Sequence, residues 1–134
     1  MKTVTRMIGD ELYESVNENG NKVMVDMRKR EEREGQSPTE LLLSALAGCG
    51  AVDIVLMLKK RRKRVEEFMI ETTGTRAEDT PRYFKAIHCH YILTSPDATD
   101  DELQKVAKLA LEKYCSVASS LKSKITFSTS VKIH

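Results

Sequence analysis

The sequence has few of the features that mark specialised classes of protein. Its three cysteines are an odd number at wide spacing with no C-x-x-C pair, so we expect neither a disulfide scaffold nor a zinc site. The formal net charge of +2 is too small by itself to indicate a nucleic-acid or membrane partner. The N-terminus lacks the apolar segment of a secretory signal. Polar and small residues break the apolar run from Leu41, so we do not expect a membrane span; they are Ser44, Gly48, Gly50 and Asp53.

What is present is an ordinary globular composition. Of 134 residues, 40% are hydrophobic and 31% are charged, with no internal repeat and no low-complexity segment. This length suits one domain over residues 1–134 that buries most of its apolar surface. With no targeting segment, we expect a cytoplasmic location.

The N-terminal part of the chain predicts a β-meander. Alternating apolar residues indicate short strands at 2–8, 11–18 and 22–28, and Asn19-Gly20 is a strong hairpin signal. The charged segment that follows, up to Ser37, is predicted to be a loop.

A long helix is predicted from Pro38 to the basic run at 59–64. Ser37 is a suitable N-cap, Pro38 suits the first helical position, and Glu40 completes a capping box. Apolar residues occupy nearly every face, so we expect a central helix that is covered on several sides. The basic run is interpreted as a solvated helix end rather than a nucleic-acid site.

The rest of the chain predicts two strands, two helices and a closing strand. The strands are expected at 66–77 and 83–95, and a helix with a capping box is expected from Thr99. Its apolar face is expected to contain Leu103, Val106, Ala107, Ala110, Leu111 and Tyr114. A short helix at 116–123 and a strand at 125–133 complete a β-β-β-α-β-β-α-α-β order, which is an α+β fold.

Cys49 is an unusual residue because it lies between two glycines, Gly48 and Gly50, in the middle of the long helix. Each glycine costs a helix interior roughly 0.5–1 kcal/mol relative to alanine. The glycines are explained either by helix packing or by clearance that lets another group approach the thiol. Cys115 is expected near the start of the short helix, where the helix dipole lowers a thiol pKa. One thiol in mid-helix and one at a helix start could form a peroxidatic and resolving pair, if the fold brings them together.

Three other groups could support chemistry. Asp53 lies one helical turn after Cys49, where it could anchor a cation, accept a proton or form an unrelated salt bridge. His88 and His90 share one strand face and could bind metal, but no third ligand is within sequence reach. Cys89 faces the other way, toward the core.

Two motifs together resemble the OsmC/Ohr family of hydroperoxide reductases, and its YhfA-like branch most closely. They are SPTELLLSALAGCGAVDIV around Cys49 and EKYCSVASSL around Cys115. The resemblance covers nearly the whole chain. It implies an OsmC-like fold, an intertwined homodimer with sites at the subunit interface, and a role in oxidative stress defence. By the same resemblance, Cys49 is the peroxidatic thiol and Cys115 the resolving thiol. Small organic hydroperoxides would be the substrate, no cofactor is needed, and an external dithiol such as a lipoylated protein or a small thiol resets the enzyme.

The chain departs from the family pattern in its supporting residues. Thr39 holds the position of the family's glutamate, with Glu40 one residue later, about 13 Å from Cys49 along the helix and on the opposite face. The family's activating arginine has no clear match, although Arg28, Arg6 and Arg30 lie nearby in sequence. We therefore name Asp53, Glu40 and Arg28 as supporting candidates. A non-enzymatic protein that binds an apolar ligand at the dimer interface remains the alternative.

Overall fold

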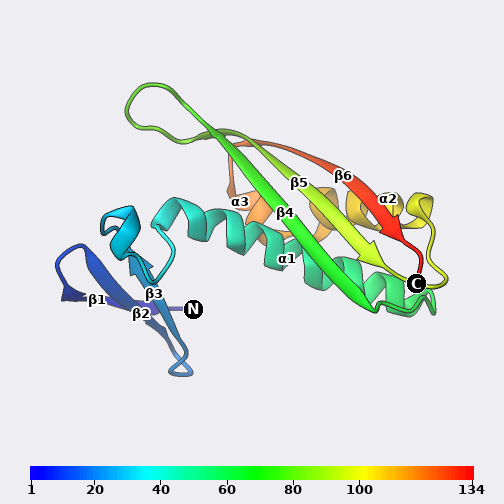
Figure 1. Ribbon diagram of the computed structural model, residues 1–134, viewed down its shortest axis with the longest axis horizontal. Helices are drawn as coiled ribbons and strands as arrows, with labels where there is room; N and C mark the ends of the chain where they lie inside the picture. Colours follow the sequence, from blue (N-terminus) through cyan, green and yellow to red (C-terminus); the bar gives the residue numbers. More distant parts are fainter. The chain divides into compact units, whose positions relative to one another are not determined.

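The computed structural model describes all 134 residues and divides them into two compact units, Met1–Leu42 and Leu43–His134. The order of strands and helices is the predicted α+β order (Figure 1). The first unit holds the meander as a three-stranded antiparallel sheet. Its strands are β1 (Thr3–Gly9), β2 (Leu12–Asn17) and β3 (Lys22–Asp26). Gly20 turns the β2–β3 hairpin with a φ of 84°, a conformation that glycine adopts at little cost.

Asp26, at the end of β3, organises the loop that follows. Its buried carboxylate accepts hydrogen bonds from the Arg28 guanidinium at 3.0 and 2.9 Å and from the amides of Glu34 and Gly35. The Arg28 side chain and these amides hold the pKa of Asp26 far below its usual range, against the opposing effect of burial. The segment expected to be a charged loop is therefore ordered, and it contains a short 3₁₀ turn at Arg30–Glu32.

The second unit packs helices on one face of a three-stranded sheet (Figure 1). The sheet has the order β4 (Glu67–Arg76), β5 (Phe84–Thr94) and β6 (Lys124–Lys132), with β4 antiparallel and β6 parallel to β5. Its helices are α1 (Pro38–Lys60), which begins in the first unit, α2 (Asp100–Leu109) and α3 (Ser116–Ser120). A π-helical turn, Ala110–Tyr114, links α2 to Cys115.

One core joins α1, α2 and the inner face of the sheet. Its fully buried side chains are Leu46, Ile54 and Leu58 of α1, Ile87, Cys89, Tyr91 and Leu93 of β5, and Leu103, Val106, Ala107 and Ala110 of α2 and the π turn. Tyr114 was expected on this apolar face, but that prediction is wrong, since its side chain is 53% exposed. The π turn adds a residue to the helical repeat, which moves Tyr114 away from the core stripe.

The long helix α1 buries only one stripe within the chain. Leu42, Val52 and Leu56 are exposed on its other side, so the expected cover on several sides is not supplied by this chain. By length and composition alone α1 could cross a membrane, with a mean hydropathy of 2.2, although central helices of soluble proteins pass the same test.

The basic run that follows α1 forms a regular helix end. Arg62 has a φ of 62°, and the amides of Arg62 and Lys63 donate to the carbonyls of Lys59 and Leu58, which is a Schellman motif. The predicted solvated helix end is therefore observed, with Lys63 also 3.4 Å from the Glu102 carboxylate.

Candidate functional site

Cys49 lies at the edge of the buried stripe of α1. Leu46 and Gly50 on either side of it are buried, whereas Cys49 itself is half-buried. Because of this position, its thiol faces the core margin rather than the core interior. The structure thus leaves Cys49 partly accessible.

Cys115 lies where the π turn ends and α3 begins. Its amide donates to the Ala110 carbonyl at 2.7 Å, which closes the π turn. Its Sγ accepts a hydrogen bond from the Ala118 amide at 3.4 Å and so caps α3. These two hydrogen bonds, one made by its backbone and one by its side chain, hold the buried thiol in place. π-helical turns are common at functional sites.

The fold brings Cys49 and Cys115 together although they lie far apart in sequence. Both are free thiols, and the Cys49 side chain lies close enough to Cys115 to raise the pKa of the Cys115 thiol. Burial raises the pKa of the Cys115 thiol, the Ala118 amide opposes that rise, and the nearby Cys49 side chain adds to it. Cys115 therefore keeps its proton in the reduced protein.

The expected direction of the Cys115 pKa shift was wrong. We predicted that the N-terminus of the short helix would lower it, and the amide of Ala118 does act in that direction. The side chain is only 3% exposed, however, and loss of hydration outweighs one amide from a five-residue helix.

The two glycines beside Cys49 have different surroundings. A Cβ atom on Gly50 would lie 3.1 Å from the Tyr91 hydroxyl, so this glycine gives clearance to a side chain from β5. A Cβ atom on Gly48 would meet nothing within 4 Å in this chain. Of the two glycines, only Gly50 therefore gives clearance to another group of this chain, and that group is the Tyr91 side chain.

Tyr91 is a residue that the sequence analysis passed over. It is fully buried, its ring stacks on Phe68 at 5.9 Å, and Phe127 packs on it at 6.3 Å. Its hydroxyl lies near the thiol of Cys89, also fully buried, yet has no well-formed hydrogen bond. The signal available in the sequence was a tyrosine on the apolar face of the strand, beside Cys89.

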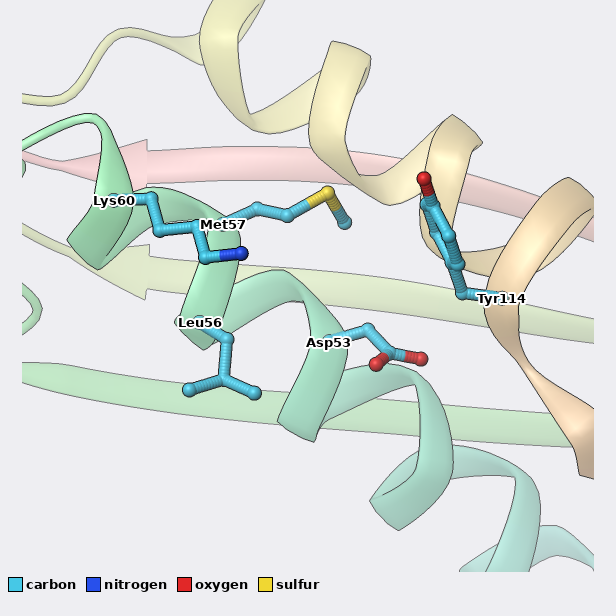
Figure 2. A pocket seen from close by; sticks show the side chains of 5 residues that line it. All are labelled: Asp53, Leu56, Met57, Lys60 and Tyr114. Atoms are coloured by element: carbon cyan, nitrogen blue, oxygen red, sulfur yellow. The ribbon is translucent and has the colours of Figure 1, made fainter.

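Asp53 lines a pocket of about 240 Å³ on the surface of α1. Figure 2 shows its carboxylate pointing toward the Tyr114 ring, with Lys60, Leu56 and Met57 along the same helix. Asp53 makes no salt bridge within this chain, and the interface salt bridge that we considered stays a prediction. Lys60 brings a cation to this pocket, but it lies eleven residues beyond Cys49, about 16 Å along the helix axis.

A second, smaller pocket of about 180 Å³ opens onto Cys115 itself. Leu111, Ala118 and Ile125 give it an apolar lining, and Glu112 and Lys113 lie at its edge. The Cys115 thiol is therefore buried but is not sealed from small molecules.

Glu40 and Arg28 both lie in the first unit, where each has a structural partner. Glu40 forms the predicted capping box, since its carboxylate accepts from the Ser37 amide at 2.9 Å and its amide donates to the Ser37 hydroxyl at 3.3 Å. Arg28 holds the Asp26 carboxylate in a bidentate pair. Neither observation shows a role in thiol chemistry.

The histidines lie on the outer face of the sheet, as predicted, with Cys89 on the inner face. His88 bonds to Thr126 at 2.7 Å and to Ser128 at 2.8 Å, and His90 bonds to Ser128 at 2.6 Å. No group of three or more His, Cys, Asp or Glu side chains in the chain could hold a metal ion. Hydroxyl groups of β6 therefore satisfy both rings.

Comparisons with known proteins agree with this arrangement. The family model described as OsmC-like protein matches residues 30–130. Protein YhfA of Escherichia coli K12 is 33% identical over 114 residues, which cover 85% of this chain and 84% of YhfA. An OsmC-like protein from Mycoplasma pneumoniae has the same fold, with a TM-score of 0.83, 21% identity, and coverage of 99% of this chain and 96% of that chain. The organic hydroperoxide resistance protein OhrB of Bacillus subtilis aligns with a TM-score of 0.64 and 15% identity over 98% of each chain.

Proposed function

Because this chain belongs to the OsmC-like family, we propose that it is a thiol-dependent peroxidase that reduces organic hydroperoxides. Cys49 is the peroxidatic residue and Cys115 the resolving residue. The observation that carries the proposal is that the fold brings the two free thiols together, with Cys115 protonated because its pKa is raised.

The proposed reaction uses the two thiols one after the other. The Cys49 thiolate attacks the terminal oxygen of the hydroperoxide, the O–O bond breaks, and the products are Cys49 sulfenic acid and an alcohol after proton uptake. Cys115 then attacks the sulfenic sulfur, and the hydroxide that leaves combines with the Cys115 proton as water. The resulting Cys49–Cys115 disulfide is reduced by an external dithiol, either a lipoylated protein or a small thiol, and no cofactor takes part.

The pocket beside Asp53, which begins one helical turn after Cys49, suits an organic rather than a purely polar substrate. The pocket beside Asp53 combines Leu56, Met57 and the Tyr114 ring with one carboxylate. An alkyl chain can pack against the apolar side chains of this pocket. The neighbour OhrB is named for resistance to organic hydroperoxides, which supports the same substrate class.

We also propose that the protein is a homodimer. Leu42, Val52 and Leu56 of α1 are 42%, 61% and 54% exposed, an unusual state for a helix with a mean hydropathy of 2.2. A second copy that packs on this surface would bury it, since large exposed apolar patches mark interaction surfaces. Light scattering at micromolar concentration should give the dimer mass, and Val52→Glu should lower it to the monomer mass; a monomeric wild-type protein would refute this assembly.

A binding protein without enzymatic activity is the second candidate. The same apolar pocket and the unmatched family arginine favour it, because an apolar ligand needs no activated thiol. Both candidates are compatible with a soluble cytoplasmic protein. The reaction of the thiols with peroxide distinguishes the peroxidase from the binding protein.

The test is to count free thiols after reduced protein meets cumene hydroperoxide. The wild type should lose two of its three thiols, and Cys89→Ala, which removes the core cysteine, should also lose two. Cys115→Ser should lose one, with Cys49 trapped as a sulfenic acid by dimedone. Cys49→Ser should lose none. Three unchanged wild-type thiols at millimolar peroxide would exclude the enzyme and leave the binding protein.

A further inference from the structure

The hydroxyl of Tyr91 is a buried hydrogen-bond donor without a partner. The residue is fully buried, and its hydroxyl has no well-formed hydrogen bond in the chain. Native proteins satisfy nearly all buried polar groups, because an unpaired one costs stability. A phenylalanine would fill the same space without that cost, so the hydroxyl calls for a functional explanation.

The hydroxyl is held beside Gly50, the residue that follows Cys49. The stacked ring of Phe68 and the tilted ring of Phe127 fix the phenol ring, so its oxygen cannot move far from its place beside Gly50. Gly50 follows Cys49 directly in α1, and its missing side chain is what admits the hydroxyl. Cys89 on its own strand and Cys115 after the π turn both raise the pKa of the Tyr91 phenol. Leu111, which lines the Cys115 pocket, would lie 3.9 Å from the same Gly50 Cβ atom that meets the Tyr91 hydroxyl.

We propose that Tyr91 donates a hydrogen bond to the Cys115 sulfur when that thiol is deprotonated to attack oxidised Cys49. The proposal rests on the proposed peroxidase function and adds a residue to its second step. In the reduced protein Cys115 keeps its proton, and Tyr91 has no good acceptor. When Cys115 loses the proton, its sulfur becomes a strong acceptor, and the waiting donor stabilises the negative charge.

Tyr91 suits this task because it does not itself ionise. Burial, and the thiols near it, raise the pKa of the Tyr91 phenol far above its usual range, so the hydroxyl stays a neutral donor. Disulfide closure takes no proton from Tyr91. The Cys115 thiolate forms the S–S bond, the S–O bond of Cys49 sulfenic acid breaks, and the hydroxide leaves with the proton from Cys115 as water, while Tyr91 keeps its own proton.

The test separates the two steps of the reaction in Tyr91→Phe. Stopped-flow measurement with one equivalent of cumene hydroperoxide follows sulfenic acid formation at Cys49 and then closure of the disulfide. We expect closure to slow by about tenfold to a hundredfold, the range for a hydrogen bond to a charged group. The rate of disulfide closure rises with pH as Cys115 deprotonates. In Tyr91→Phe this rise should occur at higher pH, because the Cys115 thiolate has lost its hydrogen-bond donor. Sulfenic acid formation should change less than about twofold.

Thr72→Val is the matched control, because Thr72 carries the other buried hydroxyl without a partner and also lies near Cys89. It should close the disulfide at the wild-type rate. The melting temperature of Tyr91→Phe should equal or exceed that of the wild type, which excludes a folding defect. Closure in Tyr91→Phe within about twofold of the wild type, with an unchanged pH profile, would overturn the role of Tyr91 alone. If wild-type Cys49 forms no sulfenic acid, the peroxidase function fails first and the role of Tyr91 falls with it.

Discussion

Replacement of Gly50 by alanine tests the placement of the Tyr91 hydroxyl through stability. In an unobstructed helix interior, alanine is favoured over glycine by about 1 kcal/mol. At this position the new methyl group would lie 3.1 Å from the Tyr91 oxygen and 3.9 Å from Leu111. The first distance is too short for comfortable contact, and the fully buried phenol has no free space into which it can withdraw.

The two effects have opposite signs, and their sizes decide the outcome. Overfilling a well-packed core costs about 1–3 kcal/mol, which meets or exceeds the gain in helix propensity. We therefore expect Gly50→Ala to leave the free energy of unfolding unchanged or to lower it by up to about 2 kcal/mol. In Tyr91→Phe the obstructing oxygen is absent, so the same change should raise the free energy of unfolding by about 0.5–1 kcal/mol.

Urea denaturation of the four proteins in this cycle gives the coupling between the two positions. The expected coupling energy is about 1–3 kcal/mol, and it arises from one oxygen atom and one methyl group. All four should be measured at the same protein concentration, because dimerisation contributes to apparent stability. If Gly50→Ala stabilises the protein equally with tyrosine or phenylalanine at position 91, the hydroxyl does not lie over Gly50 and the reasoning is wrong.

Three further predictions concern stability. Arg62→Gly should stabilise the protein by about 0.5–1 kcal/mol in thermal denaturation, because glycine adopts the left-handed conformation at the end of α1 without strain, whereas a loss of stability would contradict the Schellman assignment. The lowered pKa of Asp26 means that its stabilisation is complete above the pKa of an unfolded aspartate, near 3.9, and is lost as the pH falls below it. Urea midpoints should therefore drop more between pH 5 and pH 3 for the wild type than for Asp26→Asn, and equal drops would refute this. Thr99→Ala should cost about 1 kcal/mol in urea, because its hydroxyl accepts from the Glu102 amide in the capping box of α2, and an unchanged midpoint would mean that this cap is dispensable.

The sequence predicted those parts of the fold that depend on neighbouring residues. The capping boxes at Ser37 and Thr99, the Asn19-Gly20 hairpin and the alternation of β5 each involve residues a few positions apart, and each is observed. Such patterns can be seen in one sequence because the interaction and the spacing are both local.

Features that depend on distant residues escaped prediction. The pKa shift of Cys115 is set by how deeply the thiol is buried, which spacing along the chain cannot show. The π turn before it left Tyr114 exposed, and no local residue pattern marks the position of such a turn. Tyr91 and Gly50 are far apart in sequence, so their contact, and with it the reason for that glycine, became visible only in the folded chain.

The most direct test of the redox pair is peptide mapping of the disulfide that forms when reduced protein meets one equivalent of cumene hydroperoxide. The proximity of the two thiols predicts one cross-linked peptide pair that joins Cys49 to Cys115, with the fully buried Cys89 recovered as a free thiol. Recovery of Cys49 and Cys115 as free thiols, or a disulfide through Cys89, would contradict the account.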